Sequence, residues 1–206
     1  MTNNIDHIFY INLDKRIDRK ELFEAEFAKY ELTVERFAGI YYPPPLGFIG
    51  CGKSHLHVLE LAKLQKYKNV LICEDDFNFT EPKHVVEDCL HQLFKAKPDF
   101  DVCFLAQNLH SGTVDTDDPL FTRVRFSTTA SGYIVNEHYY DKLIELYKFA
   151  VPKLEETMAH WLYANDIIWK SLQETDNWYC FTTCLGKQRD SISDNGDGAT
   201  VARYNC

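Results

Sequence analysis

Residues 69–76 read Asn-Val-Leu-Ile-Cys-Glu-Asp-Asp, a short apolar run that ends in three consecutive acids. An apolar run of this length is typical of a strand that is buried on both faces of a sheet. A second run of the same kind, His-Ile-Phe-Tyr-Ile-Asn-Leu, occupies residues 7–13. Both strands end in polar residues, so the chemistry of the protein is expected where these strands end.

Segments with helical spacing of apolar residues separate the strands of the first half. Residues 15–30 and 54–67 show this spacing, and residues 82–95 follow a proline that suits a first helical turn. Further strands are predicted at residues 33–38 and 101–106. Alternating strands and helices predict the α/β class, with a Rossmann-like mixed, mostly parallel sheet flanked by helices.

The second half of the chain mixes strands and helices less regularly. Strands are predicted at residues 121–126, 132–135 and 177–183. Helices are predicted at residues 136–149, with Asn136 as the cap, and at 153–172. We find no internal repeat and no low-complexity linker, so one domain over residues 1–206 is expected.

The charge balance limits the classes of partner. The 206 residues contain 22 Lys and Arg against 31 Asp and Glu, a net charge of −9. This balance argues against nucleic acid or an anionic membrane as a partner bound through surface charge. No apolar run is long enough to span a bilayer, and the start lacks the features of a secretory signal. Seven cysteines, an odd number without tight pairing, favour reduced thiols and a cytoplasmic location.

Polar side chains gather at two predicted strand ends. Asn12 and Arg16, with Arg19 one helical step further on, follow the first strand, and Glu74, Asp75 and Asp76 follow another. In parallel sheets such ends meet at one edge, where ligands bind. Clustered carboxylates favour a hard cation such as magnesium or manganese, and arginine binds phosphate through paired hydrogen bonds. Together they predict a nucleotide-diphosphate site, against the alternative of a solvated acidic turn.

A second candidate phosphate site is residues 47–54, Gly-Phe-Ile-Gly-Cys-Gly-Lys-Ser, which match the P-loop pattern. Lys53 would then reach the outer phosphate and Ser54 would hold magnesium. A P-loop follows a buried strand, however, and here three consecutive prolines precede it. The simpler interpretation is that the glycines shape a loop and Ser54 caps a helix. A P-loop nucleotide phosphotransferase therefore stands as the minority alternative.

Asp166 is the candidate general base. It lies among apolar residues in Ala-Asn-Asp-Ile-Ile, residues 164–168, on a predicted helix. Such a setting raises the pKa of a carboxyl group by desolvation, which suits a base that deprotonates a hydroxyl. A buried structural aspartate, bonded to backbone or to arginine, is an equal alternative.

An ordered set of short elements resembles the family 25 glycosyltransferases, which include bacterial lipooligosaccharide and procollagen galactosyltransferases. The set comprises Ile11-Asn12-Leu13 with Arg16 and Arg19, Gly50-Cys51 with Ser54-His55, and the apolar strand into Glu74-Asp75-Asp76. It continues through Thr128-Thr129-Ala130-Ser131-Gly132-Tyr133 to Gln188 and Ser193-Asp194. No element is very specific alone, but the order spans nearly the whole chain.

The resemblance implies a GT-A fold, a UDP-sugar donor and a manganese or magnesium ion. Residues 1–107 would form the nucleotide-binding half and residues 108–206 the acceptor side. The donor would be bound by Asn12, Leu13, Arg16, Arg19, Ser54, His55, Thr129, Gln188 and Ser193. The metal would be held by Glu74, Asp75 and Asp76, with Asp76 as the leading ligand, and the family also places an aspartate near Asp166. Tyr41, Tyr42 and Trp161 are candidates for stacking on sugar or uracil.

The implied reaction moves a hexosyl unit from a UDP-sugar to a hydroxyl group of a glycan or glycoprotein acceptor. A catalytically silent nucleotide-sugar binder, with the same donor site and no turnover, stays open as a further alternative.

Overall fold

The computed structural model describes residues 4–109, 114–192, 194 and 200–201. In this part of the chain an eight-stranded sheet forms the centre, in the order β2-β1-β3-β8-β5-β9-β7-β6. The strands, in that order, are Glu35–Ala38, His7–Asn12, Asn69–Glu74, Ser127–Asn136, Val102–Leu109, Trp178–Phe181, Phe121–Arg123 and Val114–Asp115.

The sheet is mixed, and most of its strands point the same way. β1 pairs in parallel with β2 and β3, and β5 pairs in parallel with β9. β8 is antiparallel to both β3 and β5, and β7 is antiparallel to both β9 and β6. Only β7 and β8 therefore run against the other described strands of this sheet. The predicted mixed, mostly parallel sheet is confirmed.

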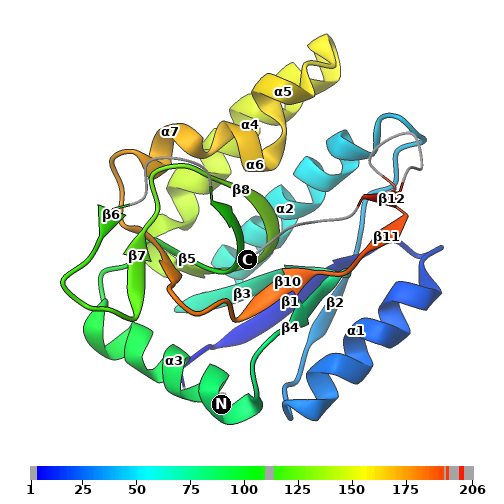
Figure 1. The fold of residues 1–206 in the computed structure, drawn as a ribbon. Helices are drawn as coiled ribbons and strands as arrows, with labels where there is room; N and C mark the ends of the chain where they lie inside the picture. Colours follow the sequence, from blue (N-terminus) through cyan, green and yellow to red (C-terminus); the bar gives the residue numbers. More distant parts are fainter. Residues whose placement is uncertain (1–3, 110–113, 193, 195–199, 202–206) are drawn as a thin grey trace.

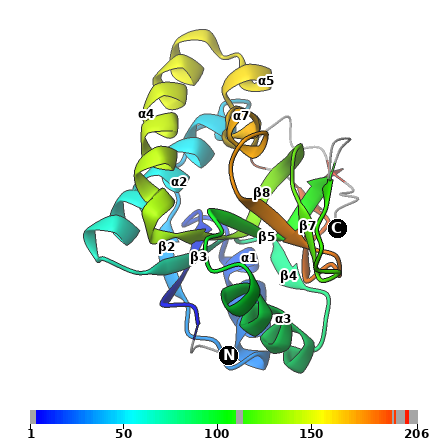
Figure 2. The same cartoon turned by 90° about the vertical axis from the view of Figure 1, so that its left-hand side faces the viewer.

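Helices cover both faces of the sheet (Figures 1 and 2). α1 (Ile17–Lys29) and α3 (Lys83–Ala96) pack on one face, and α2 (Gly47–Leu64) and α4 (Tyr140–Thr157) pack on the other. The alternating side chains of β3 enter two separate cores. Leu71 and Cys73 join the core under α1 and α3, whereas Val70 and Ile72 join the core under α2 and α4. Both faces of β3 are buried, which explains its continuous apolar run.

Helix α2 begins earlier than the sequence pattern indicates. We expected a loop up to Ser54, but the helix starts at Gly47 and Ser54 lies in its second turn. The Ser54 hydroxyl donates to the Gly50 carbonyl oxygen at 2.7 Å and accepts the Ile40 N–H at 2.9 Å. Ser54 therefore ties the helix to the segment before it and does not cap the helix.

The region after Asn136 also departs from the prediction. A short 3-10 turn (Glu137–Tyr139) precedes α4, and Asn136 makes no side-chain cap. α4 runs through Pro152, where a boundary was expected, and ends at Thr157, just before Met158, whose φ of 57° is left-handed. The predicted single helix over 153–172 is therefore wrong. Beyond α4 it is replaced by three short helices, α5 (His160–Tyr163), α6 (Asn165–Ile168) and α7 (Lys170–Gln173).

A small second sheet follows the acidic residues and was not predicted. β4 (Phe77–Phe79) pairs antiparallel with β10 (Gly186–Gln188), which sets Gln188 opposite Phe77. A third pair joins β11 (Ser191–Ile192) to β12 (Thr200–Val201). These pairings return the end of the described chain to the carboxyl end of β3 (Figure 1).

The cysteines correct one expectation. Cys184 is disulfide-bonded, so the prediction of reduced thiols is wrong for this residue. Five other cysteines are free: Cys51, Cys73, Cys89, Cys103 and Cys180. The cytoplasmic location stays a prediction that the cysteines no longer support, because disulfides are typical of oxidising compartments. Among the described residues, no helix combines the length and apolar character needed to cross a bilayer.

Candidate functional site

A polar pocket opens at the carboxyl ends of β1 and β3, beside α1 and the start of α2. Its wall includes Leu13, Arg19, Tyr42, Cys51, Ser54, His55, Glu74, Asp75, Asp76 and Asp194. The pocket lies at the edge of the sheet where ligands of parallel α/β proteins bind. Most of the residues predicted at the two strand ends therefore meet in one place.

The three consecutive acids face different sides, because Glu74 ends β3 whereas Asp75 and Asp76 form the turn that follows it. Glu74 continues the face of Ile72 and meets α2, whereas Asp75 meets α1. Arg19 Nη1 donates to Asp75 Oδ1 at 2.8 Å, and Asn12 Nδ2 donates to Asp75 Oδ2 at 2.8 Å. Burial raises the pKa of Asp75, and the charge of Arg19 opposes that shift. Asp75 thus holds Arg19 and Asn12 in place.

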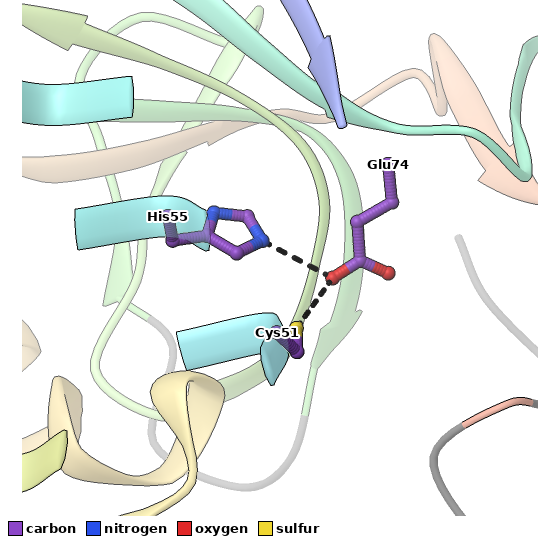
Figure 3. Close-up of side chains that lie close together, drawn as sticks. All are labelled: Cys51, His55 and Glu74. Carbon is purple, nitrogen blue, oxygen red and sulfur yellow. Dashed lines mark hydrogen bonds and ion pairs between the residues drawn. The ribbon is translucent and has the colours of Figure 1, made fainter. Parts of the chain in front are cut away.

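Glu74 lies against two residues of α2 that are one helical turn apart (Figure 3). Its Oε1 is 3.5 Å from Cys51 Sγ and 3.3 Å from His55 Nε2. The other ring nitrogen of His55 lies 2.8 Å from the Tyr133 hydroxyl, which fixes the ring. Burial, followed by the charge of Glu74, raises the pKa of the Cys51 thiol. Cys51 therefore stays protonated and donates to Glu74.

The Cys51–His55–Glu74 group is close enough to hold a metal ion, since its ligand atoms all lie within 4.8 Å of one another. A thiol and an imidazole suit a borderline ion such as zinc better than magnesium or manganese. As drawn in Figure 3, the group is also complete without a metal, as a hydrogen-bonded cluster centred on Glu74 Oε1.

Gln188 connects the acids to β8. Its Nε2 lies 3.4 Å from both Glu74 Oε2 and Asp76 Oδ1, and its Oε1 accepts the Thr129 hydroxyl at 2.8 Å. Asp76 Oδ2 is also 3.6 Å from Arg19 Nη1. Thr129 has a φ of 81°, a conformation that is strained for a β-branched residue. Gln188 therefore lies beside the acids and links them to Thr129.

Asp166 reaches the same group from α6. Its Oδ2 accepts the backbone N–H of Thr129 at 3.0 Å. Burial raises the pKa of Asp166, the charge of Glu74 raises it further, and the hydrogen bond from Thr129 opposes the shift. The desolvated environment that the sequence predicts for this carboxyl is present.

Arg16 is engaged by acids in this structure. It forms ion pairs with Asp18 at 2.8 Å and with Asp194 at 2.6 Å. Lys15 pairs with the same Asp194 carboxylate at 2.6 Å. The carboxylate of Asp194, at the pocket wall, is thus already paired with the Arg16 guanidinium. Ser193, predicted from the resemblance, lies outside the described residues.

The premise of the P-loop alternative is wrong. Residues 47–54 are helical, so the amides after the first turn bond within the helix and do not form a phosphate cradle. Lys53 pairs with Glu155 at 2.6 Å and donates to the Tyr42 hydroxyl at 2.7 Å.

Sequence reasoning missed the role of Cys51 beside Glu74. The spacing of Cys51 and His55, i and i+4, places both on one helix face, but this signal depends on knowing that the helix starts at Gly47. No sequence pattern indicated the second cavity, which Cys51 also lines.

Comparisons with known proteins bear on the fold and on a partial sequence likeness. No family model matches the chain. Over 101 residues it is 32% identical to a "Glycosyltransferase 25 family member" of Drosophila pseudoobscura pseudoobscura, a match that spans 36% of this chain and 16% of that protein. The glycosyltransferase GlyE of Streptococcus pneumoniae TIGR4 aligns with a TM-score of 0.56 at 8% identity, over 98% of this chain and 58% of GlyE.

A glycosyltransferase involved in glycosylation of the major capsid of PBCV-1 aligns with a TM-score of 0.49 at 9% identity, over 91% of this chain and 94% of that one. At such identities the structural likeness to GlyE shows the fold alone. The chain therefore has a GT-A-like α/β fold, and part of it is similar in sequence to a family 25 member, of which it spans 16%.

Proposed function

We propose that this protein transfers a hexosyl unit from a UDP-sugar to a hydroxyl group of a glycan or glycoprotein acceptor, with manganese or magnesium as cofactor. The observation that carries the proposal is the polar pocket in a glycosyltransferase fold, where Arg19, Glu74 and Asp76 lie together at the strand ends. Such a pocket pairs cationic and carboxylate groups, and a diphosphate with its divalent cation needs both.

The existing contacts of the three carboxylates indicate which of them suit a hard cation. Asp75 makes two short bonds of 2.8 Å, to Arg19 and Asn12, so it is better suited to positioning than to metal binding. The contacts of Glu74 and Asp76 given above are longer, between 3.3 and 3.6 Å, and both carboxylates lie beside the Gln188 amide. We therefore assign the ion to Glu74 and Asp76. When bound, it neutralises the charge that develops on the departing diphosphate.

The residues around the acids then take separate roles. Arg19 binds the diphosphate from the side of Asp75, and Arg16 binds it after Asp194 is displaced. Leu13 and His55 line the donor pocket. Gln188 orients the two metal-binding carboxylates, while Asn12, Ser54 and Thr129 act as positioning residues through their bonds to Asp75, Ile40 and Asp166.

Asp166 is the proposed base of an inverting transfer. Its carboxylate takes the proton of the acceptor hydroxyl while the acceptor oxygen bonds to the anomeric carbon. The bond from that carbon to the diphosphate oxygen breaks, and its electron pair leaves with UDP. A raised pKa makes the carboxylate a stronger base. The bond to Thr129 uses one oxygen only, so a structural and a catalytic role are compatible.

A donor panel tests the proposal. The purified chain is incubated with several UDP-sugars, with and without manganese, and released UDP is measured, including slow hydrolysis without acceptor. We expect manganese-dependent release from at least one donor. Asp76→Asn should reduce it to background. Asp14→Asn is the matched control, since the Asp14 side chain is 82% exposed and pairs with Arg36.

Three results would contradict parts of the proposal. Binding of UDP without any release would indicate a silent nucleotide-sugar binder. Release that is unchanged in Asp76→Asn would refute the metal assignment. Release supported by zinc in preference to manganese would move the ion to Cys51, His55 and Glu74.

A further inference from the structure

A second cavity, of about 580 Å³, borders Cys51 and the short helices α5 and α6. Cys51 lines both cavities, and Asp166 lines the second one. The volume falls within the range of small-molecule sites in proteins. A ligand in this cavity would therefore lie beside the candidate base and beside a residue of the donor pocket wall.

Three aromatic rings form a row along this cavity. The ring centroids of Phe48 and His160 are 5.3 Å apart, and those of His160 and Trp161 are 5.2 Å apart. Trp161 is 64% exposed, whereas Trp169 and Trp178 are fully buried. An exposed tryptophan beside a cavity presents a flat apolar face with a polar edge, which is suited to a ligand that also has an apolar face and polar edges.

The buried side-chain amide of Asn165, next to Asp166, lacks a hydrogen bond at its nitrogen among the described residues. Asn165 is 7% exposed and lines the cavity, and its Nδ2 has no hydrogen-bond partner among the described residues. A buried amide nitrogen without a partner is costly, so a hydroxyl oxygen from a ligand would stabilise it. Asn165 and Asp166 are thus neighbouring residues of the cavity wall that bring an amide and a carboxylate near its aromatic side chains.

We propose that this cavity binds the acceptor as a pyranose ring that stacks on Trp161 and bonds to Asn165. The inference rests on the proposed function, because it places one acceptor hydroxyl beside Asp166 and near Cys51, the residue that this cavity shares with the donor pocket. A sugar ring meets both requirements, with C–H groups on one face and hydroxyl groups around its edge. The acceptor is then a saccharide, not a hydroxylated peptide side chain.

Tryptophan fluorescence tests this assignment directly, because Trp161 is the exposed member of three tryptophans. Acrylamide quenching of the full chain is measured with methyl glycosides of glucose, galactose, mannose and N-acetylglucosamine, and with a hydroxylysine peptide. We expect at least one glycoside to protect the exposed tryptophan at millimolar concentration. Protection by the peptide alone, or by none of the probes, would overturn the inference.

Variants separate this inference from the proposed function. In saturation-transfer NMR, Trp161→Ala should weaken glycoside binding at least tenfold and Asn165→Ala several-fold. Leu162→Ala is the matched control, since Leu162 is 52% exposed on the same helix and does not line the cavity. UDP binding with manganese should be unchanged in all three variants. Unchanged glycoside binding in Trp161→Ala, with normal UDP binding, refutes the acceptor site alone. If the unmodified chain does not bind UDP, the proposed function is refuted instead.

Discussion

Gly50 is the point where α2 packs directly against the segment that follows β2. A Cβ atom at residue 50 would lie 2.0 Å from the carbonyl oxygen of Ile40, far inside van der Waals contact. Ser54 binds the N–H of the same Ile40. Gly39 and Ile40 line the donor pocket, so the substitution Gly50→Ala should displace the pocket wall as well as strain the helix.

The expected loss follows from two opposing effects. Alanine in a helix interior is favoured over glycine by about 0.5–1 kcal/mol. Overpacking costs about 1–3 kcal/mol, and the upper end applies at Gly50 because the obstacle is backbone and cannot rotate away. The net loss is then about 2 kcal/mol, which lowers the Tm of a chain of this size by about 4–8 °C.

Gly52 provides the control within the same helix. A Cβ there would meet only Val151 Cγ2, at an ordinary 3.4 Å. Gly52→Ala should therefore raise the Tm by about 1–4 °C, from the helix preference alone. Thermal and urea denaturation of both variants measure the difference, and UDP titration measures the pocket. If Gly50→Ala were as stable as Gly52→Ala, the close approach of helix and loop would be refuted.

Two further predictions concern buried carboxylates. Arg19→Met leaves Asp75 buried without its cation, and we expect a loss of about 3–5 kcal/mol at pH 7 in urea denaturation. This deficit should shrink as the pH falls and Asp75 takes up a proton, and an equal deficit at pH 5 and pH 7 would contradict it. Because burial raises the pKa of Asp166, the folded state binds its proton more tightly than the unfolded chain, and stability falls as the pH rises through that pKa. Asp166→Asn keeps an oxygen for Thr129, so it should abolish UDP release with an unchanged or higher Tm at pH 7, whereas a Tm loss of several degrees would assign Asp166 a mainly structural role.

The apolar run at residues 69–73 was sufficient to predict a central strand, because a strand buried on both faces leaves that signature. The three acids carry no such signature, because the strand ends at Glu74 and the two aspartates lie in the turn that follows it. The structure separates them, with Asp75 bound to Arg19 and Glu74 bound to Cys51.

The unpredicted parts depend on contacts between distant residues. Three glycines and the preceding prolines indicate a loop, yet residues 47–53 are helical, because Gly50 permits the close approach to Ile40. Tertiary packing overrides local helix propensity here. β4 is three residues long and pairs with β10, and the Phe77 ring fills the space that Cβ atoms at Gly132 and Gly186 would occupy. No local sequence pattern predicts the pairing of β4 with β10, which places Gln188 beside the acids.

The central claim is that the pocket at the ends of β1 and β3 takes UDP together with a divalent cation. Thermal unfolding of the unmodified chain with UDP, ADP or ATP, each with and without manganese, tests it most directly. At about one hundred times its Kd, UDP should stabilise the folded state by about 2.7 kcal/mol, a Tm rise of about 5–11 °C. We expect this rise with UDP and manganese, and a smaller one without the metal. Stabilisation by ATP but not by UDP would contradict the claim.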